Sequence, residues 1–188
     1  ISPILANIYL DKLDKYMKEY ADKFDKGERR GMNLEYKSYS GKIWWLGTKL
    51  KQTEDRETRK ELIDAIKQHQ KNRMHLPSVD EMDEGYRRIK YVRYADDFII
   101  GVIGSKADCV AIKEDIKNFL GEKLKLTLSE EKTLITHGNQ KAKFLGYEIY
   151  VRPFTDKTLR SEKSGVLIKA YGKKVVLEIP MSTMRDKL

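Results

Sequence analysis

Two adjacent carboxylates, Asp96 and Asp97, interrupt the apolar and aromatic stretch YVRYADDFII, and this pair constrains the fold more than any other feature. Residues 88–94 alternate between two faces, which predicts a strand, and the short apolar run at 98–103 predicts a second strand. Only the letters ADD separate the two. Strand, tight turn and strand together predict a β-hairpin with both carboxylates at its tip.

The rest of the chain predicts an α+β fold, an antiparallel sheet with helices packed against one face. Apolar spacings of three and four residues predict helices at 3–24 and 54–75, and Ser105 with Asp108 predicts the capped start of another. Residues 34–52 are left unassigned. The further expected elements are a strand–turn–strand at 124–137, a strand at 141–151 interrupted by Gly146, a hairpin of 165–172 with 173–180, and a new helix from Ser182.

The composition is that of a globular, basic protein: 188 residues, 40% hydrophobic, with a net charge of +9. A basic chain suggests a polyanionic partner such as nucleic acid, the alternative being a solvated, lysine-rich surface. Residues 138–188 hold 11 Lys and Arg against 5 Asp and Glu. The single cysteine, Cys109, fits a reducing compartment. We expect a bacterial cytoplasmic protein, with an organellar origin as the less favoured alternative. No apolar run reaches transmembrane length, so no membrane partner is expected.

Neighbouring carboxylates at a hairpin tip repel each other unless cations neutralise them. Magnesium prefers hard oxygen ligands and typically takes one or two carboxylates together with substrate phosphate oxygens. Two such ions, about 3.5–4 Å apart, support in-line phosphoryl transfer. The alternative is a polar turn in which the aspartates only bend the chain. The flanking strands and the basic charge favour the metal site.

Four blocks, in the right order, resemble reverse transcriptases of the group II intron maturase type. They are SPILANIYLDKLD, YVRYADDFII, LTLSEEKTLITH and FLGYEI. The second resembles the Tyr-x-Asp-Asp signature, and the last resembles the primer-grip hairpin. The resemblance implies a polymerase palm at residues 1–179, with a helical insertion at about 25–85. Residues 180–188 then resemble the start of a thumb or maturase domain.

The resemblance implies an RNA-directed DNA polymerase that binds intron RNA for splicing and copies it. It implies two magnesium ions, deoxynucleoside triphosphates, and an RNA template with a DNA primer. Asp96 and Asp97 would be catalytic metal ligands, Asp96 the more direct one, and Lys132 would lie near the incoming triphosphate. The implied nucleic-acid contacts are Tyr94 and Ala95 beneath the primer terminus, and Phe144, Leu145, Gly146 and Tyr147 along the primer. Gly146 would allow close backbone approach, or it is a β-bulge glycine.

The family pattern also has a third catalytic aspartate, followed by a Pro-Gln-Gly segment, and neither is among these 188 residues. The chain begins with Ile1, so we expect a fragment that does not polymerise alone. A homodimer is one way to cover the apolar surface of the first helix. A non-catalytic, RNA-binding maturase module stays open, as does the reverse transcriptase of a retron or diversity-generating element. The aromatic residues Tyr36, Tyr39, Trp44 and Trp45 would either stack on bases or pack as core.

Overall fold

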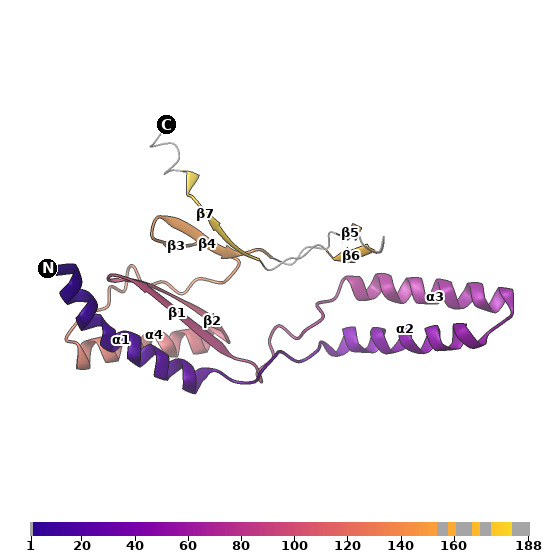
Figure 1. The fold of residues 1–188 in the computed structure, drawn as a ribbon, viewed down its shortest axis with the longest axis horizontal. Helices are drawn as coiled ribbons and strands as arrows, with labels where there is room; N and C mark the ends of the chain where they lie inside the picture. Colours follow the sequence, from indigo (N-terminus) through magenta and orange to yellow (C-terminus); the bar gives the residue numbers. More distant parts are fainter. Residues whose placement is uncertain (1, 154–157, 161–166, 170–173, 182–188) are drawn as a thin grey trace. The chain divides into compact units, whose positions relative to one another are not determined.

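A computed structural model describes residues 2–153, 158–160, 167–169 and 174–181 (Figure 1). The chain divides into two compact units. The first combines residues 1–28 and 84–153 with the chain from 172 onward, and the second combines 29–83 with 154–171. The predicted domain limits at 179 and 180 remain predictions.

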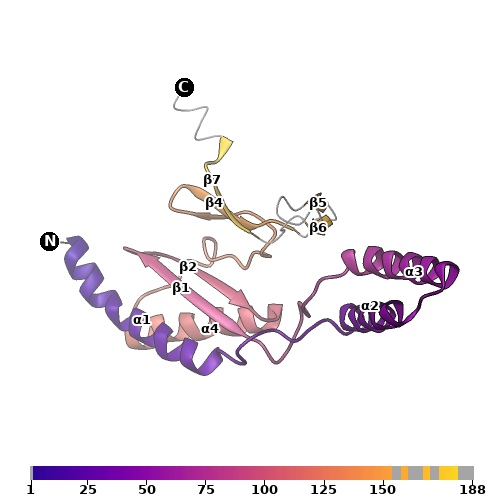
Figure 2. The ribbon, with the colours of Figure 1, turned by 45° about the vertical axis from the view of Figure 1, so that its right-hand side comes forward.

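The first unit contains the hairpin that carries the two aspartates. Its described elements are α1 (Ser2–Phe24), β1 (Arg88–Tyr94), β2 (Asp97–Ile103), α4 (Lys106–Lys123), β3 (Ala142–Phe144), β4 (Tyr147–Val151) and β7 (Val175–Glu178). β1 and β2 form an antiparallel hairpin, and β3, β4 and β7 form an antiparallel sheet with β4 in the middle. In Figures 1 and 2, α1 and α4 lie on one side of the hairpin and the three-stranded sheet lies on the other. The predicted α+β class is confirmed.

Side-chain alternation decides which face of the hairpin the helices cover. Ile89 is 1% exposed and packs on α1 and α4, while Tyr91, Phe98 and Ile100 share its face. The buried cluster consists of Leu10, Leu13, Met17, Ile89, Ile112, Ile116, Leu120 and Leu124. Because successive strand residues point to opposite faces, Asp97 lies on the face away from this core. Because the Ile89 face of the hairpin packs on the helices, the opposite face, which carries Asp97, points away from them.

One predicted strand pair is wrong. Residues 124–137 contain no strand; instead, the backbone N–H of Thr133 donates to the Ser129 carbonyl at 3.0 Å, closing a turn. Two of the alternating leucines that suggested strands pack on the helices: Leu124 belongs to the buried cluster and Leu128 lies against it, while Leu126 is exposed. Glu130 accepts from Lys113 at 3.0 Å and pairs with Lys117 at 2.6 Å, both on α4. Ion pairs with a helix thus hold the turn.

The predicted strand at 141–151 is instead a second hairpin. β3 and β4 are joined by Leu145 and Gly146, whose φ angles are 51° and 79°, and no described atom lies within 4 Å of a Cβ added at Gly146. Gly146 is therefore a turn glycine, and no bulge is involved. The predicted pairing of 165–172 with 173–180 is also wrong, because β7 pairs with β4. The helix predicted from Ser182 lies outside the described residues.

The second unit contains a pair of long helices. Its described elements are α2 (Leu34–Gln52), α3 (Arg56–Met74) and a short antiparallel pair, β5 (Thr158–Arg160) with β6 (Leu167–Lys169). Asn33 and Asp55 cap the helices by accepting from the backbone N–H groups of Tyr36 and Thr58. Residues 34–52, unassigned from sequence, are thus helical. Within the described ranges, no helix is both long and apolar enough to cross a membrane.

The first of the chain's two excursions from the first unit, residues 29–83, leaves and returns beside one pair of residues. Lys26 and Arg87 exchange two backbone hydrogen bonds, of 3.0 and 3.1 Å. Gly27 beside them has a φ of 70°, and a Cβ added there would overlap the carbonyl oxygen of Gly85. Both conditions demand glycine.

We expect Gly27→Ala to lower the free energy of unfolding by about 1–3 kcal/mol, because it combines left-handed backbone strain with the clash at Gly85. The matched control is Gly121→Ala in α4, where an added Cβ meets nothing within 4 Å among the described residues. That change should raise stability by about 0.5–1 kcal/mol, because alanine favours helix. Urea unfolding measures both; effects of the same sign would contradict the structure.

Candidate active site

The tip of the β1–β2 hairpin is a two-residue turn. Tyr94 pairs with Asp97, so Ala95 and Asp96 form the loop, and Ala95 has a φ of 54°. Two-residue hairpin loops require positive φ and usually use glycine or asparagine. An alanine in this conformation costs about 1–2 kcal/mol. Something else must hold the turn in place.

Arg93 holds it from the covered face of the hairpin. Its Nη1 donates to the Ala95 carbonyl at 2.6 Å and to Asn7 Oδ1 at 2.9 Å. Its Nε and Nη2 donate to the two carboxylate oxygens of Asp14, at 2.9 and 2.6 Å. Such two-point contacts fix a guanidinium more firmly than a single bond. Since Asn7 and Asp14 lie on α1, the turn is fastened to that helix.

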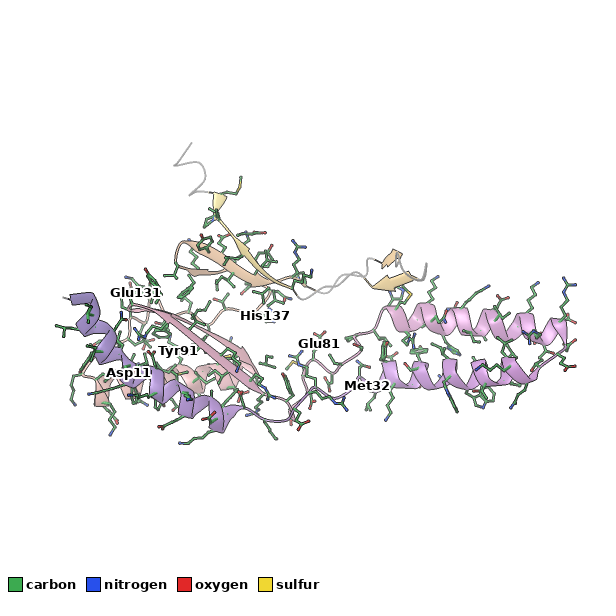
Figure 3. The ribbon with its side chains drawn as sticks, viewed as in Figure 1. Asp11, Met32, Glu81, Tyr91, Glu131 and His137 are labelled. Atoms are coloured by element: carbon green, nitrogen blue, oxygen red, sulfur yellow. The ribbon has the colours of Figure 1, made fainter. Side chains whose placement is uncertain are left out.

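Tyr91 completes the network, and Figure 3 labels it between the hairpin and α1. Its hydroxyl donates to Asp14 Oδ1 at 3.0 Å. The hydrogen bond from Arg93 lowers the pKa of Asp14, and the same bond raises the pKa of Arg93. Burial raises the pKa of the Tyr91 hydroxyl. Asp14 is therefore an ionised structural anchor at neutral pH.

Asp96 and Asp97 are in a different situation from Asp14. Both are exposed, and within the described part of the chain neither carboxylate has a hydrogen bond or ion pair. Two neighbouring carboxylates free of protein cations fit the hard oxygen ligands that divalent ions prefer. Among the described residues, no group of three or more His, Cys, Asp or Glu side chains converges. The donor set seen here is the aspartate pair alone.

A groove of about 360 Å³ opens beside Asp97. It is lined by Asp97, Phe98, Lys132, Lys143, Phe144, Leu145, Gly146, Tyr147 and Pro180. Three blocks far apart in sequence therefore meet at one surface: the hairpin, the turn at 129–133, and the β3–β4 hairpin. Figure 3 labels Glu131, the neighbour of Lys132, at the tip end of β1 and β2.

The groove contains most of the site residues predicted from the sequence. Asp97, Lys132 and residues 144–147 line it, while Asp96, Ala95 and Tyr94 lie outside the lining. Tyr94, 67% exposed, shares the open face of the hairpin with Asp97. Sequence reasoning missed Phe98, Lys143 and Pro180. Lys143 directly precedes the FLGYEI block, and this position could have identified it as a site residue from the sequence.

Comparison with known proteins identifies the family. The family described as "Reverse transcriptase (RNA-dependent DNA polymerase)" matches residues 60–149. The group II intron-encoded protein LtrA of Lactococcus lactis is 47% identical over 152 residues, covering 81% of this chain and 25% of LtrA. This chain belongs to the reverse transcriptase family. Its predicted resemblance to the group II intron type is confirmed.

Two eukaryotic relatives extend the comparison. The putative COX1/OXI3 intron 2 protein of Saccharomyces cerevisiae is 38% identical over 171 residues, covering 88% of this chain and 18% of that protein. The nuclear intron maturase 2 of Arabidopsis thaliana is 23% identical over 183 residues, covering 97% of this chain and 21% of that protein. This reverse transcriptase chain thus spans about a quarter or less of the length of these relatives.

We expect Asp14→Asn to lower the free energy of unfolding at pH 7 by about 1–2 kcal/mol, because Arg93 loses its ionised partner. The pKa of Asp14 is lowered in the folded state. Its stabilisation is therefore present above the unfolded value of about 3.9 and is lost as the pH falls through the folded pKa. Urea unfolding at several pH values should show the two proteins converging below about pH 4.

The control is Asp11→Asn on the same helix, labelled in Figure 3. Asp11 pairs with Lys15 at 2.6 Å, and both side chains are more than half exposed. Surface pairs of this kind contribute little, so a much smaller change is expected. Equal losses at Asp11 and Asp14 would contradict an anchoring role for Asp14.

Proposed function

We propose that this chain is the catalytic palm portion of an RNA-directed DNA polymerase encoded by a group II intron. One observation carries the proposal: Asp97, Lys132 and the Phe144–Tyr147 hairpin line a single groove. Each comes from a different sequence block, and a polymerase needs them together. Family membership supports the class of reaction, and the groove supports the choice of residues that would carry it out.

Asp96 and Asp97 would hold divalent cations, which we propose are two magnesium ions. When bound, these ions would neutralise charge on the attacking and departing oxygens of nucleotide joining. Asp97 offers its carboxylate to the groove, and Asp96 offers the adjacent one from the turn. The Arg93 contact to the Ala95 carbonyl keeps both at a fixed place on the hairpin.

Lys132 and the β3–β4 turn would position the substrates. Lys132 is exposed in the groove, where its ammonium would bind phosphate oxygens of the incoming deoxynucleoside triphosphate. Leu145 and Tyr147 are each 42% exposed and present apolar surface to a primer strand. Tyr94 would support the primer terminus from the open face of the hairpin. The primer would be a DNA strand annealed to an RNA template.

The RNA partner would be the intron itself, bound both for splicing and as template. A non-catalytic maturase is the second candidate, favoured by similarity along 97% of the chain to a protein named as an intron maturase. The aspartates, exposed and without a hydrogen bond or ion pair among the described residues, favour the polymerase, because a binding module has no use for them. Both candidates share RNA binding and differ only in chemistry.

We expect Asp97→Asn in the full-length protein to reduce nucleotide incorporation on primed RNA on the order of 10²–10⁴-fold, because one metal-binding charge is lost. Lys132→Gln should cost less, about 10-fold to 100-fold. RNA affinity should stay within about twofold in both. Asp11→Asn, with the same charge change on α1, should leave incorporation intact. Full activity in Asp97→Asn would refute the polymerase assignment.

We also expect the affinity for primed RNA to fall steeply with salt. Each neutralised phosphate contributes a slope of about −0.7 to −0.9 in log K against log salt concentration. Filter binding between low and physiological salt measures it. A flat response would count against a basic surface that binds the backbone.

A further inference from the structure

The helix pair of the second unit separates the four aromatic residues that sequence analysis grouped together. Tyr36 and Tyr39 are half-buried against α3, where Arg73 lies 5.3 Å from the Tyr36 ring and His69 lies 5.8 Å from Tyr39. Trp44 and Trp45 are 73% and 57% exposed. The tyrosines pack between the helices, and the tryptophans do not.

Trp44 lies on a distinct stripe of α2. Helical periodicity places Lys37, Gly41, Thr48 and Lys51 on its face, at three, four or seven residues' distance. We call these five residues the Trp44 stripe. Glu35, the only acidic residue of α2, precedes Trp44 by nine residues and therefore lies half a turn away. The stripe carries positive charge without a carboxylate.

Glycine in this stripe has no packing explanation. An added Cβ at Gly41 would meet no described atom within 4 Å, and the same holds for Gly47 on the other side of Trp44. Each glycine inside an exposed helix costs about 1 kcal/mol relative to alanine. Helical side chains lean toward the N-terminus, so the indole lies toward the turn that contains Gly41. The missing side chain at that position agrees with the 73% exposure of Trp44.

An uncovered indole between lysines suits a planar, negatively charged ligand. Bases of single-stranded nucleic acid stack on such rings, and their phosphates pair with nearby cations. Trp45 differs, because the Lys49 ammonium already lies 5.4 Å from its ring centroid. A protein partner would favour a continuous apolar patch, whereas the helix neighbours of Trp44 at three and four residues' distance are Ser40, Gly41, Gly47 and Thr48.

We propose that the Trp44 stripe binds single-stranded RNA, with an unpaired base stacked on Trp44 and phosphates paired with Lys37 and Lys51. This goes beyond the proposed polymerase chemistry, because the stripe belongs to the other unit and joins no nucleotides. It deepens the proposed RNA binding by naming the residues and the strand form that they recognise.

The test uses the full-length protein and a short oligouridylate that cannot form a duplex, with binding followed by fluorescence anisotropy. Trp44→Ala should weaken affinity about tenfold, because one stacked base is lost, and Trp44→Phe should retain most of it. Lys37→Gln and Lys51→Gln should each reduce the salt slope by about 0.7, whereas Trp44→Ala should leave that slope unchanged. Trp45→Ala is the matched control and should stay within about twofold.

Gly41→Leu separates binding from folding. A leucine three residues before Trp44 packs on the indole and favours helix, so thermal stability should rise while oligouridylate affinity falls several-fold. Asp97→Asn should leave oligouridylate binding unchanged while nucleotide incorporation falls on the order of 10²–10⁴-fold, so each proposal can fail by itself. Unchanged binding in Trp44→Ala, or equal losses in Trp44→Ala and Trp45→Ala, would overturn the stripe as an RNA site.

Discussion

The contact between Arg93 and Asp14 is the interaction on which the candidate active site depends. It joins the hairpin to α1 through two charge-assisted hydrogen bonds, and Arg93 also holds the Ala95 carbonyl at 2.6 Å. The acidic turn contains two like charges and a strained alanine, so it does not favour its own conformation. Because Arg93 binds the turn from the covered face, it does not occupy the open face on which Asp97 lies. The contacts that stabilise the turn therefore lie on one face of the hairpin, and the candidate metal ligand Asp97 lies on the other.

The turns of the β1–β2 and β3–β4 hairpins each hold a residue other than glycine in a left-handed conformation. Ala95 has a φ of 54° and Leu145 a φ of 51°. Such strain persists only where the surroundings enforce it, and it gathers at functional sites. Arg93 supplies the restraint at Ala95. At Leu145 the neighbouring Gly146 supplies the second positive φ that a tight hairpin requires. The strained leucine puts apolar surface at the rim of the groove.

The structural features that could be predicted from the sequence were those that follow from one local pattern. Alternation placed Ile89 and Arg93 on one face of the hairpin, and the Ser105–Asp108 capping box is present as expected. Residues 124–137 were misassigned because alternating leucines serve a strand or a loop against helices equally well. The bidentate Arg93 contact could not be foreseen, since it joins residues 79 apart. The groove could be predicted only from the family resemblance, because that resemblance implies that sequence blocks far apart in the chain lie together in the fold.

The paired backbone hydrogen bonds between Lys26 and Arg87 mean that the first unit is closed before the long helices begin. A short loop in place of residues 29–83 would leave α1, both hairpin strands and the Asp14–Arg93 pair with the described partners named above. The excursion can therefore change in length or sequence without altering the groove. A segment set apart in this way can carry a binding surface of its own at little cost to the stability of the first unit.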